Sequence, residues 1–287
     1  MKIIFSRKGF DSSSGGCPNP ILPDGSLMPL PIPDQHSPIS YGDITDHGIN
    51  LGEMVNDLTK GKITANNGAH LDPDVTKTSL ARKRGWQAVL GQHGSAQGHL
   101  TKQGVTTGDL FLFFGLFQPV IHTDEGWRFD KQQKPRHMFW GWLQIGASYA
   151  VSELKPQQLK WAHYHPHFFL PEEKNNTLYI AAEQLQLSKK VEGINGAGLF
   201  NRPADALQLT APDARTPSQW QVPAWLYPSE GKIPLSYHHK MDRWQQPKAG
   251  QKHIALQGVA RGQEFVLDTR DYPQAKRWAL NLIKKST

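Results

Sequence analysis

The sequence is almost without cysteine, with Cys17 alone among 287 residues. A single thiol excludes an intramolecular disulfide and a cysteine-rich zinc site, and it suits a reducing compartment such as the cytoplasm. Long apolar runs are also missing, since none approaches the roughly 20 residues that a membrane-spanning helix needs. The apolar start at residues 3–5 is too short for a signal peptide. We therefore expect a cytoplasmic protein that does not contact a membrane.

The glycine spacings of the phosphate-binding loop and of the dinucleotide-binding turn are absent, which argues against a nicotinamide or flavin enzyme. What the chain does have is a modest excess of positive charge, with 32 Lys and Arg against 25 Asp and Glu, a net charge of +7. This excess favours an anionic partner, with nucleic acid as the leading candidate, although solubility alone explains it equally well.

The apolar pattern predicts a fold rich in strands. The strongest strand signals are residues 107–117 and 138–146, which a polar segment separates and which we expect to form a hairpin. Other strands are expected at residues 3–5, 176–181 and 263–268, and helices at residues 50–60, within 92–100 and at 271–285. We predict an α+β fold with few helices and a twisted or barrel-like sheet. Without repeats or a long polar linker, residues 1–287 should form one compact unit.

The first candidate site follows the predicted strand at residues 3–5. The strand runs into a loop of charged and hydroxyl side chains with two glycines, composed of Arg7, Lys8, Asp11, Ser12, Ser13, Ser14, Gly15 and Gly16. Such a loop can offer positive charge, hydroxyls and backbone N–H groups to an anion. We predict that Arg7, Lys8 and Ser12 to Ser14 bind phosphate and that Asp11 belongs to the catalytic groups. The alternative is an ordinary solvated turn.

The second candidate is the segment His70-Leu71-Asp72-Pro73-Asp74. Two carboxylates with a histidine nearby can hold a divalent cation, because hard cations prefer oxygen ligands. Asp-x-Asp also resembles the cation and nucleotide-sugar motif of many glycosyltransferases. The alternative is a capped turn, a role that Asp-Pro-Asp fills well.

The third candidate is His163-Tyr164-His165-Pro166-His167. On a strand the three imidazoles would share one face, which suits a transition metal or a proton shuttle. Pro166 weakens this argument because proline interrupts a central strand. We predict that His165 and His167 act in acid–base or hydrogen-bonding roles.

The fourth candidate is Glu264, at the start of the predicted last strand. Period two places Glu264, Val266 and Asp268 on one face of that strand. The Glu264 carboxyl group can serve as a general acid or base, or contact the edge of a base. The alternative is a surface charge at a strand end.

Taken in order, several motifs resemble those of the nucleotide-modification-associated domain 3 family over nearly the whole chain. They are Lys8-Gly9-Phe10-Asp11-Ser12-Ser13, Pro18-Asn19-Pro20-Ile21, His70-Leu71-Asp72-Pro73-Asp74, His165-Pro166-His167-Phe168, Asn176-Thr177-Leu178-Tyr179, Gly196-Ala197-Gly198 and Gly262-Gln263-Glu264-Phe265-Val266. The resemblance implies a bacterial or phage system that modifies bases in DNA, and it assigns no catalysed step and no residue role. A local likeness to PUA-like and EVE-like modules predicts a PUA-like strand core around residues 105–182.

Three functions remain open. The first is an enzyme, a transferase or hydrolase acting on a nucleobase or nucleotide, whose cofactor is left open with a divalent cation as the candidate. Its predicted catalytic residues are Asp11, Asp72, Asp74, His165, His167 and Glu264. The second is a reader that binds modified nucleic acid in a PUA-like pocket lined by aromatic residues. The third is a scaffold whose partners are the other proteins of a modification system.

Overall fold

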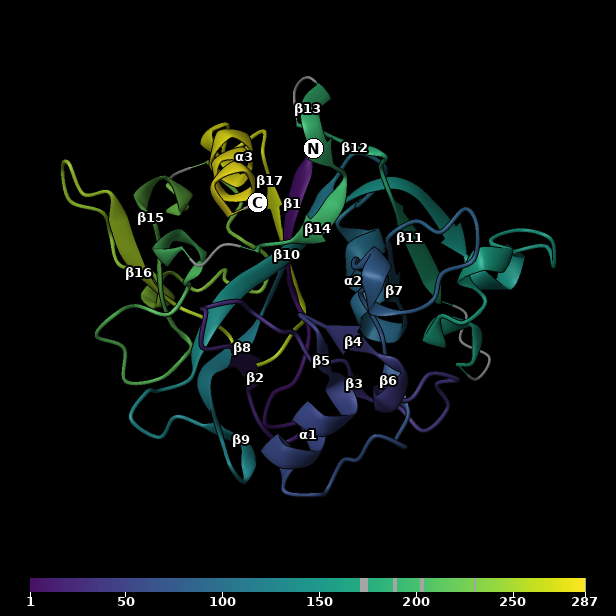
Figure 1. Ribbon diagram of the computed structural model, residues 1–287. Coiled ribbons are helices and arrows are strands. Elements are labelled where there is room, and N and C mark those ends of the chain that lie inside the picture. Colours follow the sequence, from purple (N-terminus) through teal and green to yellow (C-terminus); the bar gives the residue numbers. More distant parts are fainter. Residues whose placement is uncertain (171–174, 188–189, 202–203, 230, 287) are drawn as a thin grey trace.

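The computed structural model describes residues 1–170, 175–187, 190–201, 204–229 and 231–286. Its centre is a mixed sheet of nine strands, whose main path runs in the order β17-β1-β8-β10-β11-β7 (Figure 1). These strands are β1 (Lys2–Arg7), β7 (Val89–Gln92), β8 (Leu110–Thr123), β10 (Arg136–Ala150), β11 (Thr177–Ala181) and β17 (Glu264–Asp268). Three short strands join from the side, β2 (Asn19–Ile21) and β9 (Gly126–Phe129) on β8 and β14 (Ala197–Leu199) on β10.

The strand β1 lies between two neighbours, parallel to β8 and antiparallel to β17. Its successive apolar residues Ile3, Ile4 and Phe5 point to opposite faces of the sheet and are all buried, so both faces are covered. The predicted strands at residues 107–117 and 138–146 are confirmed as β8 and β10, which pair antiparallel. The segment between them is not only a loop, because β9 turns back onto the end of β8 as a further hairpin.

Four two-stranded ribbons surround the sheet. They pair β3 (Ile32–Pro33) with β6 (Ala69–His70), β4 (Thr45–Asp46) with β5 (Ile49–Asn50), β12 (Gln184–Gln186) with β13 (Lys190–Asn195), and β15 (Gln219–Pro223) with β16 (His253–Gln257). The ribbon of β3 and β6 matters for function because it carries His70 to the sheet.

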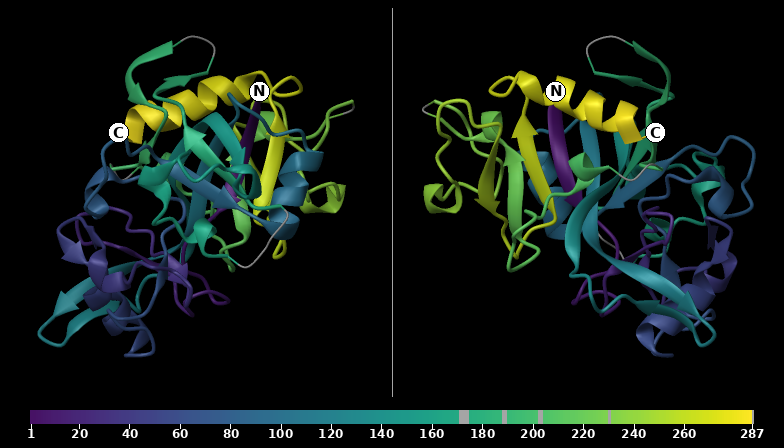
Figure 2. Two further views of the ribbon diagram at one scale, coloured as in Figure 1. Left: turned by 90° about the vertical axis from the view of Figure 1, so that its right-hand side faces the viewer. Right: turned by 60° about the vertical axis from the view of Figure 1, so that its left-hand side comes forward.

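The described residues form three α-helices, α1 (Leu51–Thr59), α2 (Gly94–Lys102) and α3 (Gln274–Ser286). The predicted start of α1 is confirmed, since the Asn50 side chain accepts a hydrogen bond from the Gly52 N–H at 2.8 Å. Helix α3 crosses the sheet near the N-terminus, where Trp278 packs against Phe5 and Phe139 (Figure 2). Short 3₁₀ helices span Tyr41–Asp43, Lys77–Ser79, Val151–Glu153, Lys160–Ala162, Pro166–Phe168, Asp205–Leu207, Ala224–Leu226 and Met241–Arg243.

Residues 163–167 do not form the strand that would have placed three imidazoles on one face. The chain instead forms one 3₁₀ turn before this segment, at Lys160–Ala162, and a second that Pro166 begins, at Pro166–Phe168. Proline suits the first position of a helical turn because its φ is fixed near the helical value and its missing N–H is not needed there. As a result His165 and His167 are buried, whereas His163 is exposed.

The prediction of a strand-rich α+β fold is confirmed. The sheet curls but does not close, since β7 and β17 form no strand pair in the described part of the chain. Their ends are linked through side chains, with Gln92 Nε2 2.6 Å from Glu264 Oε1. Residues 105–182 include β8 to β11, and their likeness to a PUA module stays a prediction. No helix among the described residues has the length and apolar character to cross a membrane.

Candidate functional site

Buried polar side chains gather where β1 and β7 end and β17 begins. Ser6, Gln92 and Glu264 come from these strands, and all are at most 4% exposed. Two irregular segments add the neighbouring side chains Asp72, His165 and His167. Burial of so many polar groups is unfavourable unless each has a partner. The cluster is therefore the first place to look for function.

Asp72 is at the centre of this cluster. Lys8, the first residue after β1, places its ammonium nitrogen 3.2 Å from Asp72 Oδ2. The backbone N–H of Gly91 donates to Asp72 Oδ1 at 2.5 Å. Burial by itself raises the pKa of this carboxyl group, but Lys8, together with the surrounding donors, outweighs burial and holds the pKa well below its usual range. Asp72 is therefore an ionised carboxylate inside the protein.

His167 is held in one tautomer. The Asn176 amide nitrogen donates to the His167 carbonyl oxygen at 2.7 Å, which leaves Asn176 Oδ1 to accept from His167 Nδ1 at 2.6 Å. Nδ1 therefore carries the hydrogen, and Nε2 presents a lone pair on the side of Asp72, 3.9 Å from Oδ2. Burial lowers the pKa of His167 to about 3, so the ring is neutral at neutral pH.

A glycine makes room for this ring. A Cβ atom on Gly91 would lie 2.2 Å from His167 Cδ2, a distance that no side chain can adopt. Gly91 therefore has two roles, since its N–H also binds Asp72.

His70 approaches the cluster from β6. Its Nδ1 lies 2.8 Å from Asp34 Oδ2, and this hydrogen bond is the largest reason why the pKa of Asp34 is lowered. Because a carboxylate only accepts, His70 Nδ1 is the donor and Nε2 is left free. The His70 and His167 rings are 5.4 Å apart.

His165 has the opposite tautomer. Its Nδ1 accepts from the His167 backbone N–H at 3.4 Å, so the hydrogen is on Nε2. That nitrogen is 3.3 Å from Asp72 Oδ1, in a direction that makes no good hydrogen bond in the described structure. His165 is therefore a buried donor beside Asp72, and not a source of a free lone pair.

Glu264 is the second buried carboxyl group. Its Oε1 accepts from Ser6 Oγ at 2.9 Å and from Gln92 Nε2 at 2.6 Å, while Oε2 has no hydrogen-bond partner in the described part of the chain. Burial raises its pKa to about 7, with a further increase from Asp72 and an opposing effect of Lys8. Such a group can give and take a proton near neutral pH.

Two predicted catalytic carboxylates bind other partners. Asp74 forms a two-point ion pair with Arg82, with both N–O distances 2.7 Å, and accepts a hydrogen bond from the Tyr164 hydroxyl. Asp11 Oδ1 accepts from the backbone N–H groups of Ser13 at 2.8 Å and Ser14 at 2.9 Å. These bonds already use two of the N–H groups that the loop could have offered to a phosphate.

Most of the other residues predicted to bind phosphate also lie, or form their hydrogen bonds, away from the Asp72 cluster. Ser12 and Ser13 are exposed, and the Ser13 hydroxyl donates to Asp11. Arg7 donates to the carbonyl oxygens of Val259 at 3.0 Å and Ala260 at 3.1 Å, and burial lowers its pKa. Of the five residues predicted to bind phosphate, only Lys8 has a contact within the Asp72 cluster that the structure records.

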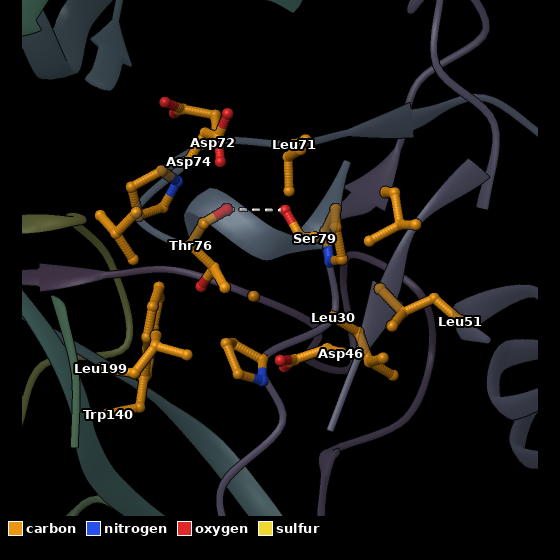
Figure 3. A pocket seen from close by; sticks show the side chains of 16 residues that line it. Leu30, Asp46, Leu51, Leu71, Asp72, Asp74, Thr76, Ser79, Trp140 and Leu199 are labelled. Atoms are coloured by element: carbon orange, nitrogen blue, oxygen red, sulfur yellow. Dashed lines mark hydrogen bonds between the residues drawn. The ribbon is translucent and has the colours of Figure 1, made fainter. Parts of the chain in front are cut away.

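A pocket adjoins the segment that carries Asp72. Figure 3 shows Asp72 and Asp74 at one end of it and Asp46 toward the other. Its walls are largely apolar and include Leu30, Leu51, Leu71, Trp140 and Leu199. Burial raises the pKa of Asp46, in opposition to its neighbour His47. The segment that carries Asp72 therefore borders a mostly apolar pocket, and Leu51 of α1 lines the same pocket.

Several cluster residues were not predicted from the sequence, namely Ser6, Asp34, Gly91, Gln92 and Asn176. Their side chains and backbone groups act by orienting other groups, and no local pattern marks that role. His70 was noted only as a neighbour of the two aspartates. The spacing of His70 and Asp72 by two residues was its one visible signal, since such residues share a face of an extended chain.

The comparisons with known proteins agree with the resemblance drawn from the motifs. The model of the family described as nucleotide modification associated domain 3 matches residues 2–268. Neither the curated proteins nor the solved structures that were compared include a significant match to the chain. The chain belongs to the nucleotide modification associated domain 3 family.

Proposed function

We propose that this member of the nucleotide modification associated domain 3 family is an enzyme that changes a nucleobase or nucleotide in a bacterial or phage DNA-modification system. The supporting observation is a pair of buried carboxyl groups near Lys8, with Asp72 ionised and the pKa of Glu264 raised to about 7. Enzymes that move protons at neutral pH use pairs of acids whose environments separate their pKa values in this way.

The proposal gives each charged group a role. Glu264 is the proton donor and acceptor, because its Oε2 is not engaged by the described protein groups. Lys8 binds the substrate phosphate or another developing negative charge. Its side chain is only 11% exposed, and its positive charge acts on both carboxyl groups, lowering the pKa of Asp72 and opposing the rise in the pKa of Glu264. Asp72 orients Lys8 and the histidines. His165 and His167 complete the polar wall, and we leave Asp11 and Asp74 outside the site because their oxygens bind other parts of the protein.

The test is the nucleoside content of DNA from cells that carry the whole modification system. We expect digested DNA to contain a modified nucleoside when the chain is wild type and to lose at least nine-tenths of it with Glu264→Gln or Asp72→Asn. The matched control Asp11→Asn removes a carboxylate from the exposed loop and should leave the nucleoside unchanged. An identical nucleoside profile in wild type and both cluster variants would refute the proposal.

The same cells separate the enzyme from a reader. A reader would leave the modified nucleoside in place in both variants while the purified variants lose affinity for that DNA in a mobility-shift measurement. Four of the nine tryptophans offer a reader little surface, because Trp140, Trp142, Trp220 and Trp244 are all at most 6% exposed.

A further inference from the structure

We infer that His70, Asp72 and His167 bind one divalent transition-metal ion. One ligand atom from each of the three lies within 4.8 Å of the other two. His70 lies on β6 and Asp72 follows two residues later, whereas His167 comes from the distant 3₁₀ turn Pro166–Phe168. Folding brings His167 to the other two, and no hydrogen bond between the side chains of the three is recorded among the described residues.

The tautomers point to the ligand atoms. In both His70 and His167 the hydrogen is on Nδ1, so Nε2 is the nitrogen with a free lone pair. A histidine that binds a metal through Nε2 almost always donates its Nδ1–H to a carboxylate, a carbonyl or a similar acceptor. Asp34 Oδ2 and Asn176 Oδ1 are such acceptors, at 2.8 and 2.6 Å. The outer shell of a metal site is therefore already built.

His165 illustrates the contrast. Its Nε2 is closer to Asp72 than that of His167, at 3.3 Å against 3.9 Å, yet it carries the hydrogen and has no lone pair to offer. We therefore place His165 beside the ion as a neighbour of Asp72 and not as a ligand.

The ligand set indicates the class of ion. Imidazole nitrogens suit zinc, copper, iron and nickel ions, whereas magnesium, calcium and manganese ions prefer oxygen ligands. Two ligand atoms about 2.1 Å from one ion are about 3.0 to 3.4 Å apart, so the three groups must close in by about 1 to 2 Å. His70 can supply this movement, because its side chain is 13% exposed on a two-residue strand. Three protein ligands leave positions open for water or substrate.

The positive charge of Lys8 should weaken metal binding. Its ammonium group is 3.2 Å from Asp72 Oδ2 and neutralises the carboxylate when no metal is bound. A second cation on the same carboxylate is repelled by Lys8. Lys8→Met should therefore bind the metal more tightly than the wild type, the opposite of what a ligand variant does.

The experiment is a titration of chelator-treated protein with Co²⁺, followed by visible absorption and by calorimetry. We expect one ion per chain, and at least a tenfold loss of affinity in His70→Ala and in His167→Ala. Asn176→Ala should weaken binding about 10- to 100-fold, as loss of an outer-shell partner typically does. The control His163→Ala removes an exposed histidine of the same segment and should bind as the wild type does.

A glycine pair gives an independent test that removes no ligand. Gly91→Ala places a methyl group against the His167 ring and should weaken Co²⁺ binding, whereas Gly98→Ala, whose Cβ would meet only Asn175 at 4.0 Å, should not. Failure of the wild type to bind Co²⁺, or equal affinity in wild type, His70→Ala and His167→Ala, would overturn the inference. Because binding is measured without substrate, this result is independent of the nucleoside assay.

Discussion

Glu264 couples the stability of the protein to pH. Its pKa is about 7 in the folded protein against an ordinary value of 4.5, so between these values the folded protein holds a proton that the unfolded chain has released. Protonated Glu264 therefore contributes its full stability below pH 4.5, and this contribution is lost as the pH rises toward 7. The difference corresponds to about 3 kcal/mol, at about 1.4 kcal/mol for each pH unit between the two values.

Glu264→Gln should remove this dependence, because a glutamine oxygen can still accept from Ser6 and Gln92. In urea unfolding of metal-free protein we expect the variant to match the wild type at pH 4.5 and to exceed it by up to about 3 kcal/mol at pH 8. The exposed residue Glu125 supplies the control Glu125→Gln, with no pH-dependent difference. Parallel stability curves for wild type and Glu264→Gln would show that Glu264 has the same pKa in the folded and unfolded protein, which contradicts the raised pKa.

At the scale of elements, Tyr164 joins the two irregular segments of the site by bonding to an ion pair in the segment after His70. Asp74 and Arg82 are 1% and 6% exposed, and the Tyr164 hydroxyl bonds to Asp74. The Arg82 guanidinium also lies over the Trp86 ring, 4.6 Å from its centre. The segment after His70 is thereby tied to the segment before His165. Asp74 thus has a structural role that keeps the candidate ligands in place.

Arg82→Met should leave the Asp74 carboxylate buried without its cation. We expect a loss of about 3 to 5 kcal/mol in the free energy of unfolding, the range for breaking a buried pair from one side. The double variant Arg82→Met, Asp74→Leu removes both charges and should recover part of that loss. Urea unfolding gives the free energy of unfolding of the wild type and both variants. A loss below about 0.5 kcal/mol in the single variant would show that this ion pair contributes no more than an exposed surface pair does.

At the scale of the whole molecule, the hydrophobic clusters run across the full length of the chain. The main cluster includes Ile3 of β1 and Ile283 of α3, and the second, formed by residues 10–71, also contains Val120 of β8. The two clusters thus share the long strand β8, since Phe111 and Phe117 belong to the main one. We expect residues 1–287 to unfold as a single cooperative unit.

Calorimetry tests this expectation. One transition, with equal calorimetric and van't Hoff enthalpies, should describe unfolding. A separate early transition for the N-terminal cluster would show instead that residues 10–71 form a unit of their own, and limited proteolysis would then release that segment first.

The sequence by itself determined the parts of this protein that local chemistry decides. Continuous apolar runs need burial on both faces, and so β1, β8 and β10 were predictable. An N-cap and helical spacing likewise marked α1, and the ordered motifs indicated the family. The single cysteine excluded a disulfide framework, because an intramolecular disulfide needs two thiols.

Only the tertiary structure decided which polar groups meet. Asp72 and Asp74 are two residues apart, yet one lies in the histidine cluster and the other binds Arg82, because each is surrounded by different distant segments. The tautomer of His167 depends on Asn176, the space for its ring on Gly91, and the proton of Glu264 on burial against β1 and β7. These are contacts between residues far apart in the chain, and no pattern of neighbouring residues encodes them.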